Sequence, residues 1–304
     1  MRIVFFGTPD FAVESLKVLH EVHQISAVVT APDKPGGRGH QLIEPPVKKW
    51  AQENKVRVLQ PKNLKSKIFE NKLHKLNADL FVTAAFRMLP QSIWCLPPLG
   101  TINLHGSLLP KYRGAAPIQR AILCGEKETG LTTFVIGESI DTGSILMQVK
   151  TPIGPEECFG DLYERLKAMG GPLLLKTLEG LERGTLHAKP QDENQVTYAP
   201  KITSDDLVID WNRDCQEVNN QIRAFSPLPG AFTVFEGIKY KILRAIPRPG
   251  LSNAPPGTWN FEDPKSLKIH TLNGHLEITE IQPESKKKMA IGDFLNGYTR
   301  KKGS

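Results

Sequence analysis

Cysteine is scarce in this sequence, and its spacing argues against a covalent or metal-linked framework. Only four cysteines occur in 304 residues, at positions 95, 124, 158 and 215, and no two of them form a CxxC pair. Zinc sites and disulfide-rich domains both need closely patterned cysteines. We therefore expect no metal site, no disulfide framework and a reducing compartment, namely the cytoplasm.

Long apolar runs are also missing. No stretch of about 18 apolar residues occurs, so the sequence holds no candidate transmembrane helix. The opening MRIVFFGTPDFA has one basic residue and an apolar run that is too short for a signal peptide. No device for oligomerisation is evident either. We expect a monomer that has no membrane partner.

Two common catalytic fingerprints are absent. The turn GTPDFA does not match the dinucleotide-binding pattern GxGxxG, because Pro9 stands where a glycine is needed. This argues against an NAD-dependent oxidoreductase. Ser107 lacks the GxSxG context of a nucleophilic serine, which argues against a serine hydrolase.

The residues that are present indicate a folded, basic protein. The hydrophobic fraction is 39%, the charged fraction is 23% and the net charge is +7. A chain of this length can form two domains with a sizeable core. A basic balance favours a polyanionic partner such as RNA, although many basic proteins bind no nucleic acid.

The first half of the chain alternates strand-like and helix-like segments. Short apolar runs, typical of buried strands, lie at residues 3–6, 25–29, 56–59, 79–85 and 101–104. Helical spacing separates them, as at residues 11–19 and 64–76, and a longer helical pattern covers 161–181. This alternation predicts an α/β fold with a Rossmann-like, doubly wound, mostly parallel sheet. Ligands of such sheets bind at the carboxyl ends of the strands.

Three other segments differ from this pattern. Residues 31–46, APDKPGGRGHQLIEPP, are rich in Pro, Gly and basic residues and predict a long exposed loop. We place the first domain at 1–188 and a polar linker at 189–208. From residue 209 to 304, short strands at 231–235, 240–245, 267–271 and 276–281 are separated by turns. They predict a small all-β domain, an OB-like β-barrel.

The stretch NLHGSLLPKYRGAAPIQRAI carries the clearest candidate site. Asn103 and His105 are two residues apart and would share one side of a strand end, where ligands are expected. An amide donor and a titratable imidazole suit an oxygen that gains charge during attack on a carbonyl. Asp141 lies in a loop between two strand-like runs and could relay protons through His105. Satisfied polar groups at a strand end and an Asx-turn are the plain structural alternatives.

Four motifs together resemble the methionyl-tRNA formyltransferase family of folate-dependent formyltransferases. They are FFGTPDFA, PDKPGGRG, NLHGSLLPKYRGAAPIQRAI and ESIDTGSIL, and the similarity runs through nearly the whole chain. The resemblance implies a catalytic set of Asn103, His105 and Asp141. It implies folate-binding residues Ser107, Leu108, Leu109 and Pro110, with Phe86, Met88 and Leu89 in the pocket wall, and tRNA-binding residues Lys34, Arg38 and Lys48.

The resemblance also implies an activity. The family transfers the formyl group of 10-formyltetrahydrofolate to the α-amino group of methionyl-initiator-tRNA, without a metal, and the β-domain contacts tRNA. Family members commonly show AYG where this chain has Ala85-Phe86-Arg87. A folate-dependent formyltransferase acting on a small amine and a non-catalytic RNA-binding protein are the alternatives.

Overall fold

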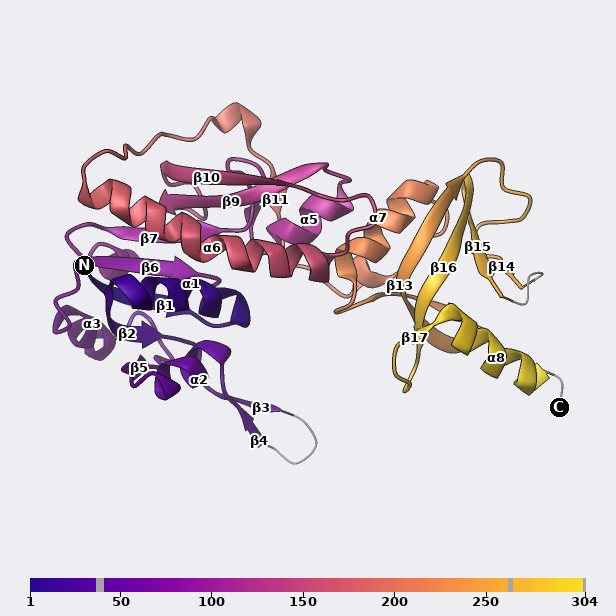
Figure 1. The fold of residues 1–304 in the computed structure, drawn as a ribbon, viewed down its shortest axis with the longest axis horizontal. Helices are drawn as coiled ribbons and strands as arrows, with labels where there is room; N and C mark the ends of the chain where they lie inside the picture. Colours follow the sequence, from indigo (N-terminus) through magenta and orange to yellow (C-terminus); the bar gives the residue numbers. More distant parts are fainter. Residues whose placement is uncertain (37–40, 262–264, 303–304) are drawn as a thin grey trace. The chain divides into compact units, whose positions relative to one another are not determined.

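The computed structural model describes residues 1–36, 41–261 and 265–302 (Figure 1). This part of the chain forms two compact units. The first unit consists of residues 1–114, 130–151 and 163–198. The second consists of residues 115–129, residues 152–162 and the chain from residue 199 onward. The predicted linker, residues 189–208, contains short 3-10 turns at Glu193–Gln195 and Asp205–Leu207. It also contains a two-residue strand, β11 (Tyr198–Ala199), which pairs with β8 (Arg113–Gly114).

A seven-stranded sheet lies at the centre of the first unit, in the order β10, β9, β7, β6, β1, β2, β5. Its strands are β1 Arg2–Gly7, β2 Gln24–Val29, β5 Val58–Leu59, β6 Leu80–Ala84, β7 Thr101–His105, β9 Glu128–Val135 and β10 Ile145–Pro152. The pairs between β1, β2, β5, β6 and β7 are parallel, whereas β9 is antiparallel to β7. The predicted Rossmann-like, mostly parallel sheet is confirmed, and the order reverses beside β1.

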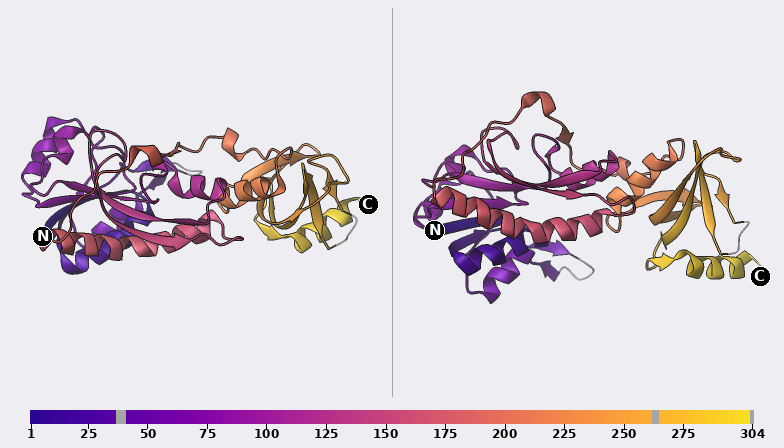
Figure 2. Two further views of the ribbon diagram at one scale, coloured as in Figure 1. Left: turned by 90° about the horizontal axis from the view of Figure 1, so that it is seen from above. Right: turned by 45° about the horizontal axis from the view of Figure 1, so that its top comes forward.

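Helices cover both faces of this sheet (Figure 2). They are α1 Asp10–Val22, α2 Pro46–Glu53, α3 Lys67–His74, α4 Gln91–Trp94 and α6 Phe159–Glu182. The α6 helix packs closely on α1 and the sheet because it carries glycines. A Cβ atom at Gly170 would lie 2.7 Å from Ser15 Oγ and 2.8 Å from Leu104 Cδ2. On the opposite face, Val4, Phe6 and Phe81 of the sheet share a hydrophobic cluster with residues of α3 and α4.

The prediction of a long loop at residues 31–46 was wrong over part of its length. Strands β3 (Lys34–Gly36) and β4 (Gln41–Ile43) form an antiparallel hairpin, and α2 begins at Pro46. Local pairing replaces the expected loop because polar contacts hold the base of the hairpin. The Lys48 ammonium contacts the carboxylates of Asp33 and Glu44, and the Gln60 amide donates to Asp33 Oδ1 over 2.8 Å.

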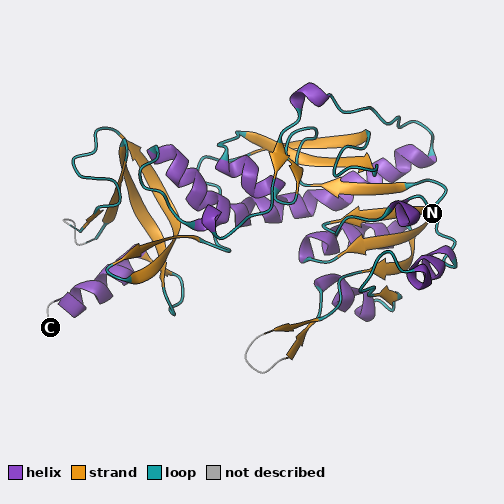
Figure 3. Ribbon diagram, turned by 180° about the vertical axis from the view of Figure 1, so that it is seen from behind, coloured by secondary structure: helices purple, strands orange, loops and turns teal. Residues whose placement is uncertain are grey.

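The second unit contains a curled antiparallel sheet (Figure 3). Its strands are β12 Ala231–Phe235, β13 Ile238–Pro249, β14 Trp259–Asn260, β15 Leu267–Thr271, β16 Gly274–Pro283 and β17 Met289–Ala290. Register shifts between β13 and β16 near Arg244 break the regular pairing, and such bulges bend a strand. All four strands predicted in this region are present, two of them longer than predicted.

An all-β description of the chain after residue 209 was incomplete, because two helices accompany the sheet. They are α7 (Cys215–Phe225) and α8 (Ile291–Lys302), and α5 (Pro117–Leu123) also belongs to the second unit. The Asp214 side chain caps α7 by accepting from Gln216 N–H over 2.7 Å. Val218, Ile222 and Phe225 are fully buried along one side of that helix. Within the described residues, no helix has the length and apolar character to cross a membrane.

Candidate active site

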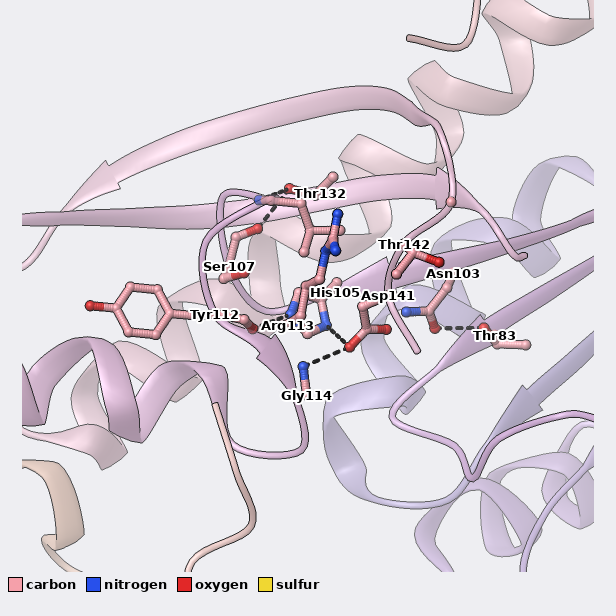
Figure 4. Close-up of polar contacts among 12 residues, drawn as sticks. Thr83, Asn103, His105, Ser107, Tyr112, Arg113, Gly114, Thr132, Asp141 and Thr142 are labelled. Carbon is pink, nitrogen blue, oxygen red and sulfur yellow. Dashed lines mark hydrogen bonds and ion pairs between the residues drawn. The ribbon is translucent and has the colours of Figure 1, made fainter. Parts of the chain in front are cut away.

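Asn103 is positioned by the neighbouring strand of the sheet. Thr83 on β6 is paired in register with Asn103 on β7. The Thr83 hydroxyl donates to Asn103 Oδ1 over 2.6 Å. This contact orients the amide so that its N–H₂ group faces Asp141 (Figure 4). A side-chain amide donor is therefore presented at the carboxyl edge of the sheet.

His105 is the last residue of β7, and its side chain is only 6% exposed. Its Nε2 lies 2.8 Å from the carbonyl oxygen of Tyr112. Its Nδ1 lies 3.6 Å from Asp141 Oδ2, which is close enough for an ion pair but too long for a direct hydrogen bond. Both ring nitrogens thus face oxygen acceptors. The Nε2 contact is a hydrogen bond, whereas the Nδ1 contact is longer than one.

Asp141 lies between His105 and Asn103 (Figure 4). It belongs to the loop that joins β9 to β10, as predicted, and its backbone φ of 55° lies in the left-handed region. Its Oδ2 accepts a 2.8 Å hydrogen bond from the backbone N–H of Gly114. Two residues further on, a Cβ atom at Gly143 would lie 1.6 Å from the carbonyl oxygen of Val135, so only glycine fits there. The structure brings the three predicted catalytic residues together.

The segment after His105 is fixed to the sheet by polar side chains. The Thr132 hydroxyl on β9 donates to Ser107 O over 2.7 Å and accepts from Leu109 N–H over 3.1 Å. The Gln148 amide on β10 donates to Leu109 O and to the same Thr132 hydroxyl, both over 2.9 Å. The backbone that leads away from His105 is therefore tied to β9 and β10 by side-chain hydrogen bonds.

Comparisons with known proteins agree with this arrangement. The formyl transferase family model matches residues 1–178, and the model of the formyl transferase C-terminal domain matches residues 201–299. Methionyl-tRNA formyltransferase of Porphyromonas gingivalis is 44% identical over 309 residues, covering 98% of this chain and 96% of that protein. The enzyme of Carboxydothermus hydrogenoformans is 43% identical, covering 98% and 97%.

The chain belongs to the methionyl-tRNA formyltransferase family. Solved structures share its fold. The N-formyltransferase of Helicobacter canadensis, in complex with folinic acid, superposes with a TM-score of 0.69 at 21% identity, covering 94% of this chain and 99% of that chain. HypX of Aquifex aeolicus, in complex with tetrahydrofolic acid, gives 0.65 at 21% identity and covers 98% of this chain. This chain spans 47% of HypX, about half its length.

The residues predicted to bind folate in this formyltransferase differ in exposure. Ser107 and Leu109 are buried, and the Ser107 hydroxyl donates to Lys111 O over 2.6 Å. Leu108 and Pro110 are half-buried. Their predicted contact with folate stays a prediction.

The three residues predicted to form the pocket wall also differ in exposure. Phe86 packs against Phe6 with ring centroids 5.6 Å apart, Leu89 is buried and Met88 is 62% exposed. The guanidinium of Arg87, the residue that departs from the family pattern, donates to the carbonyl oxygens of Pro61 and Lys62. Of the three predicted wall residues, Met88 therefore presents the most side-chain surface.

Two of the three predicted tRNA-binding residues, Lys34 and Lys48, lie in or beside the hairpin. Lys34 is exposed on β3, and Arg38 lies outside the described residues. Lys48 is 12% exposed and ion-paired with Asp33 and Glu44. The hydrogen bond from Lys48, followed by the one from Gln60, holds the pKa of the Asp33 carboxyl below its ordinary value. Lys48 thus fixes the base of the hairpin, and its predicted contact with tRNA stays a prediction.

Sequence reasoning missed several residues that support the site. Thr83, Thr132 and Gln148 orient it through the hydrogen bonds described above. A polar residue inside a buried strand, such as Thr132 in GLTTFV, was an available signal, because a buried hydroxyl needs partners. Among the described residues, no group of three or more His, Cys, Asp or Glu side chains is arranged to hold a metal ion.

Proposed function

We propose that this protein transfers the formyl group of 10-formyltetrahydrofolate to the α-amino group of methionyl-initiator-tRNA. The single observation that carries the proposal is the cluster of Asn103, His105 and Asp141 at the carboxyl edge of the sheet. Membership of the methionyl-tRNA formyltransferase family supports the substrates. The product is N-formylmethionyl-tRNA, the initiator of translation.

The reaction makes and breaks one bond to the formyl carbon. The neutral amine nitrogen bonds to that carbon, and the bond from the carbon to N10 of the folate breaks. One proton leaves the amine, and N10 gains one. Negative charge develops on the formyl oxygen on the way, so a preorganised donor near that oxygen lowers the barrier.

Asn103 and His105 are suited to that task. Thr83 donates to the amide oxygen of Asn103, which leaves the N–H₂ group of Asn103 turned away from Thr83. We assign this N–H₂ group as the donor to the formyl oxygen. The His105 imidazolium adds positive charge beside it. The gap of 3.6 Å between His105 Nδ1 and Asp141 Oδ2 leaves Nδ1 without a short hydrogen bond, so a substrate oxygen or a water can compete for it.

Asp141 is assigned the proton transfer. Asp141 Oδ2 already accepts a hydrogen bond from the backbone N–H of Gly114. The second carboxylate oxygen is therefore the one that we assign to a proton from the attacking amine, directly or through a water.

We assign the donor folate to the segment Ser107, Leu108, Leu109, Pro110 and to Phe86, Met88 and Leu89. The half-buried Leu108 and Pro110 and the exposed Met88 offer apolar surface to a flat heterocycle. Ser107 and Leu109 are buried, and Thr132 and Gln148 hold their backbone. The folate supplies the activated formyl group, whereas the chain supplies the surface that orients it.

We assign tRNA recognition to Lys34, Arg38 and Lys48 and to the domain at residues 209–304. The net charge of +7 supports a polyanionic partner. Cationic side chains that contact phosphates position the RNA and make binding depend on salt. The boundaries at 188 and 208 and the monomeric state stay predictions.

A transfer assay with two acceptors tests the proposal. Purified protein and 10-formyltetrahydrofolate are offered methionyl-initiator-tRNA and glycinamide ribonucleotide in parallel, and formylated products are quantified. Formylation of the tRNA alone, slowed by about 100-fold or more but still measurable in Asp141→Ala, is the expected result. Transfer to the small amine alone would overturn the assigned acceptor, and no transfer to either would overturn the activity.

A further inference from the structure

Gln191 makes four hydrogen bonds beside the candidate site, although it lies in a segment predicted to be a linker. Its Nε2 donates to the backbone carbonyl oxygens of Asp141 and Gly143, both over 2.8 Å. Its Oε1 accepts from Arg113 Nε over 3.0 Å and from Arg113 Nη2 over 2.9 Å. Both donors and both acceptor sites of the Gln191 amide are therefore in use.

Arg113 connects this contact to the rest of the site. Its side chain is 3% exposed, and its guanidinium donates to Glu193 over 2.7 and 3.2 Å. The next residue, Gly114, donates its backbone N–H to Asp141 Oδ2. Two contacts therefore hold Asp141. Gly114 N–H donates to its carboxylate, and Gln191, which Arg113 holds in place, donates to its backbone carbonyl.

We propose that Gln191 is a positioning residue that sets Asp141 against His105 for catalysis. This inference rests on the proposed function. Asp141 has a left-handed backbone, a conformation that is costly for a non-glycine residue and persists only where the surrounding structure holds it. Gln191 supplies that hold by fixing the carbonyl oxygens on both sides of Thr142. Its own orientation is fixed by the rigid fork of Arg113.

Asp141 must be placed precisely because its contact with His105 is already longer than a hydrogen bond. His105 Nδ1 and Asp141 Oδ2 are 3.6 Å apart, so a small shift of the loop either closes or abolishes their interaction. Displacements of about 1 Å in an active site can cost about 100-fold in rate. In the described structure Gln191 contacts Asp141 through its backbone carbonyl and not through its carboxylate, so we assign Gln191 no direct chemical role.

The first experiment separates kcat from KM in Gln191→Ala. We expect kcat to fall roughly 10- to 100-fold while KM for methionyl-tRNA and for 10-formyltetrahydrofolate changes less than about 3-fold. Gln195→Ala is the matched control, because Gln195 is exposed and its amide donates only to Asp192 in the described structure. The control should keep the kcat of the original protein.

Gln191→Glu keeps the length of the side chain and its partner Arg113 but replaces the donating nitrogen with oxygen. It therefore tests the two carbonyl contacts even if the alanine variant is poorly folded. We expect its kcat to fall as in Gln191→Ala. A kcat like that of the original protein in Gln191→Glu would overturn the proposal.

A double-mutant cycle separates positioning from a general loss of stability. Once Asp141 is replaced by Ala, adding Gln191→Ala should lower kcat by less than about 2-fold, because Gln191 acts through Asp141. A multiplicative loss would overturn the proposal. If Asp141→Ala alone left the activity intact, the proposed function of Asp141 would fail instead, so the two failures are distinguishable.

Discussion

Two segments of the first unit are assigned to function, and they differ in how they are held. The strand-end segment, residues 103–114, is fixed by Thr83, Thr132, Gln148 and Asp141 through hydrogen bonds along its length. The described part of the hairpin, β3 and β4, is held by polar side chains only at its base. Beyond that base, Leu42 and Ile43 are 65% and 59% exposed.

The difference matches the two tasks. Stabilisation of a developing charge needs donors that are already in place, because reorganisation during the reaction would raise the barrier. Binding to a polyanion depends more on the number of cationic groups than on their exact geometry. The strand-end segment should therefore control kcat, and the hairpin should control the KM for tRNA and its dependence on salt.

The largest effect is expected from His105→Ala. This change removes the imidazole ring that lies between the carbonyl of Tyr112 and the carboxylate of Asp141. Acid–base groups typically contribute about 100- to 10,000-fold in rate, so we expect kcat to fall within that range. Steady-state kinetics measure it, and His74→Ala on the exposed side of α3 is the control. A loss below about 10-fold would contradict the assigned role.

A second, smaller effect is expected from Thr132→Val, which keeps the shape but removes a buried hydroxyl. Ser107 O and Leu109 N–H would each lose a partner. Leaving buried groups unpaired should lower the free energy of unfolding by roughly 1–3 kcal/mol. Urea denaturation measures this, with the exposed Thr185→Val as the control. Equal stability of the two variants would show that Thr132 does not fix the segment.

Lys34→Ala should act on binding alone. If Lys34 contacts one phosphate, the salt dependence of tRNA binding should become shallower by about one unit in the log–log slope. The kcat at saturating tRNA should stay within about 2-fold, because Lys34 lies on the hairpin and not in the strand-end segment. Lys72→Ala on α3 is the control. An unchanged slope would remove Lys34 from the tRNA-binding surface.

The smallest effect concerns the base of the hairpin at low pH. Lys48 lowers the pKa of Asp33, so the folded carboxyl loses its charge at a lower pH than the unfolded one. The stabilisation is therefore full above the unfolded pKa and is lost as the pH falls through the lowered, folded value. A carbon NMR titration should place the Asp33 midpoint below 3.8, and Lys48→Met should move it upward. An unchanged midpoint would show that Lys48 does not hold Asp33.

The sequence was sufficient for features that depend on local patterns. Alternating apolar runs predicted the strands of the parallel sheet, and the two-residue spacing placed Asn103 and His105 at one strand end. Helix α7 was missed because the whole of residues 209–304 was interpreted as an all-β domain. Its signals were present: Asp214 as a cap, then Val218, Ile222 and Phe225 at helical spacing.

Features that depend on long-range contacts were not predictable from local pattern. Gln191 lies about 50 positions after Asp141 in the chain, and nothing in its neighbours indicates that its amide reaches the Asp141 loop. The β3–β4 hairpin was missed for a similar reason, because Lys48 and Gln60 hold its base from outside the segment. The Pro- and Gly-rich composition favoured a loop, and tertiary contacts overrode it.

A single-turnover measurement tests the contrast between the two segments most directly. Formylation of methionyl-initiator-tRNA is followed at saturating enzyme in the original protein, in Asn103→Ala and in the double variant Lys34→Ala with Arg38→Ala. We expect a rate about 100- to 1,000-fold lower for Asn103→Ala and within about 2-fold of the original for the hairpin variant. A hairpin variant that stays as slow as Asn103→Ala at saturation would contradict it.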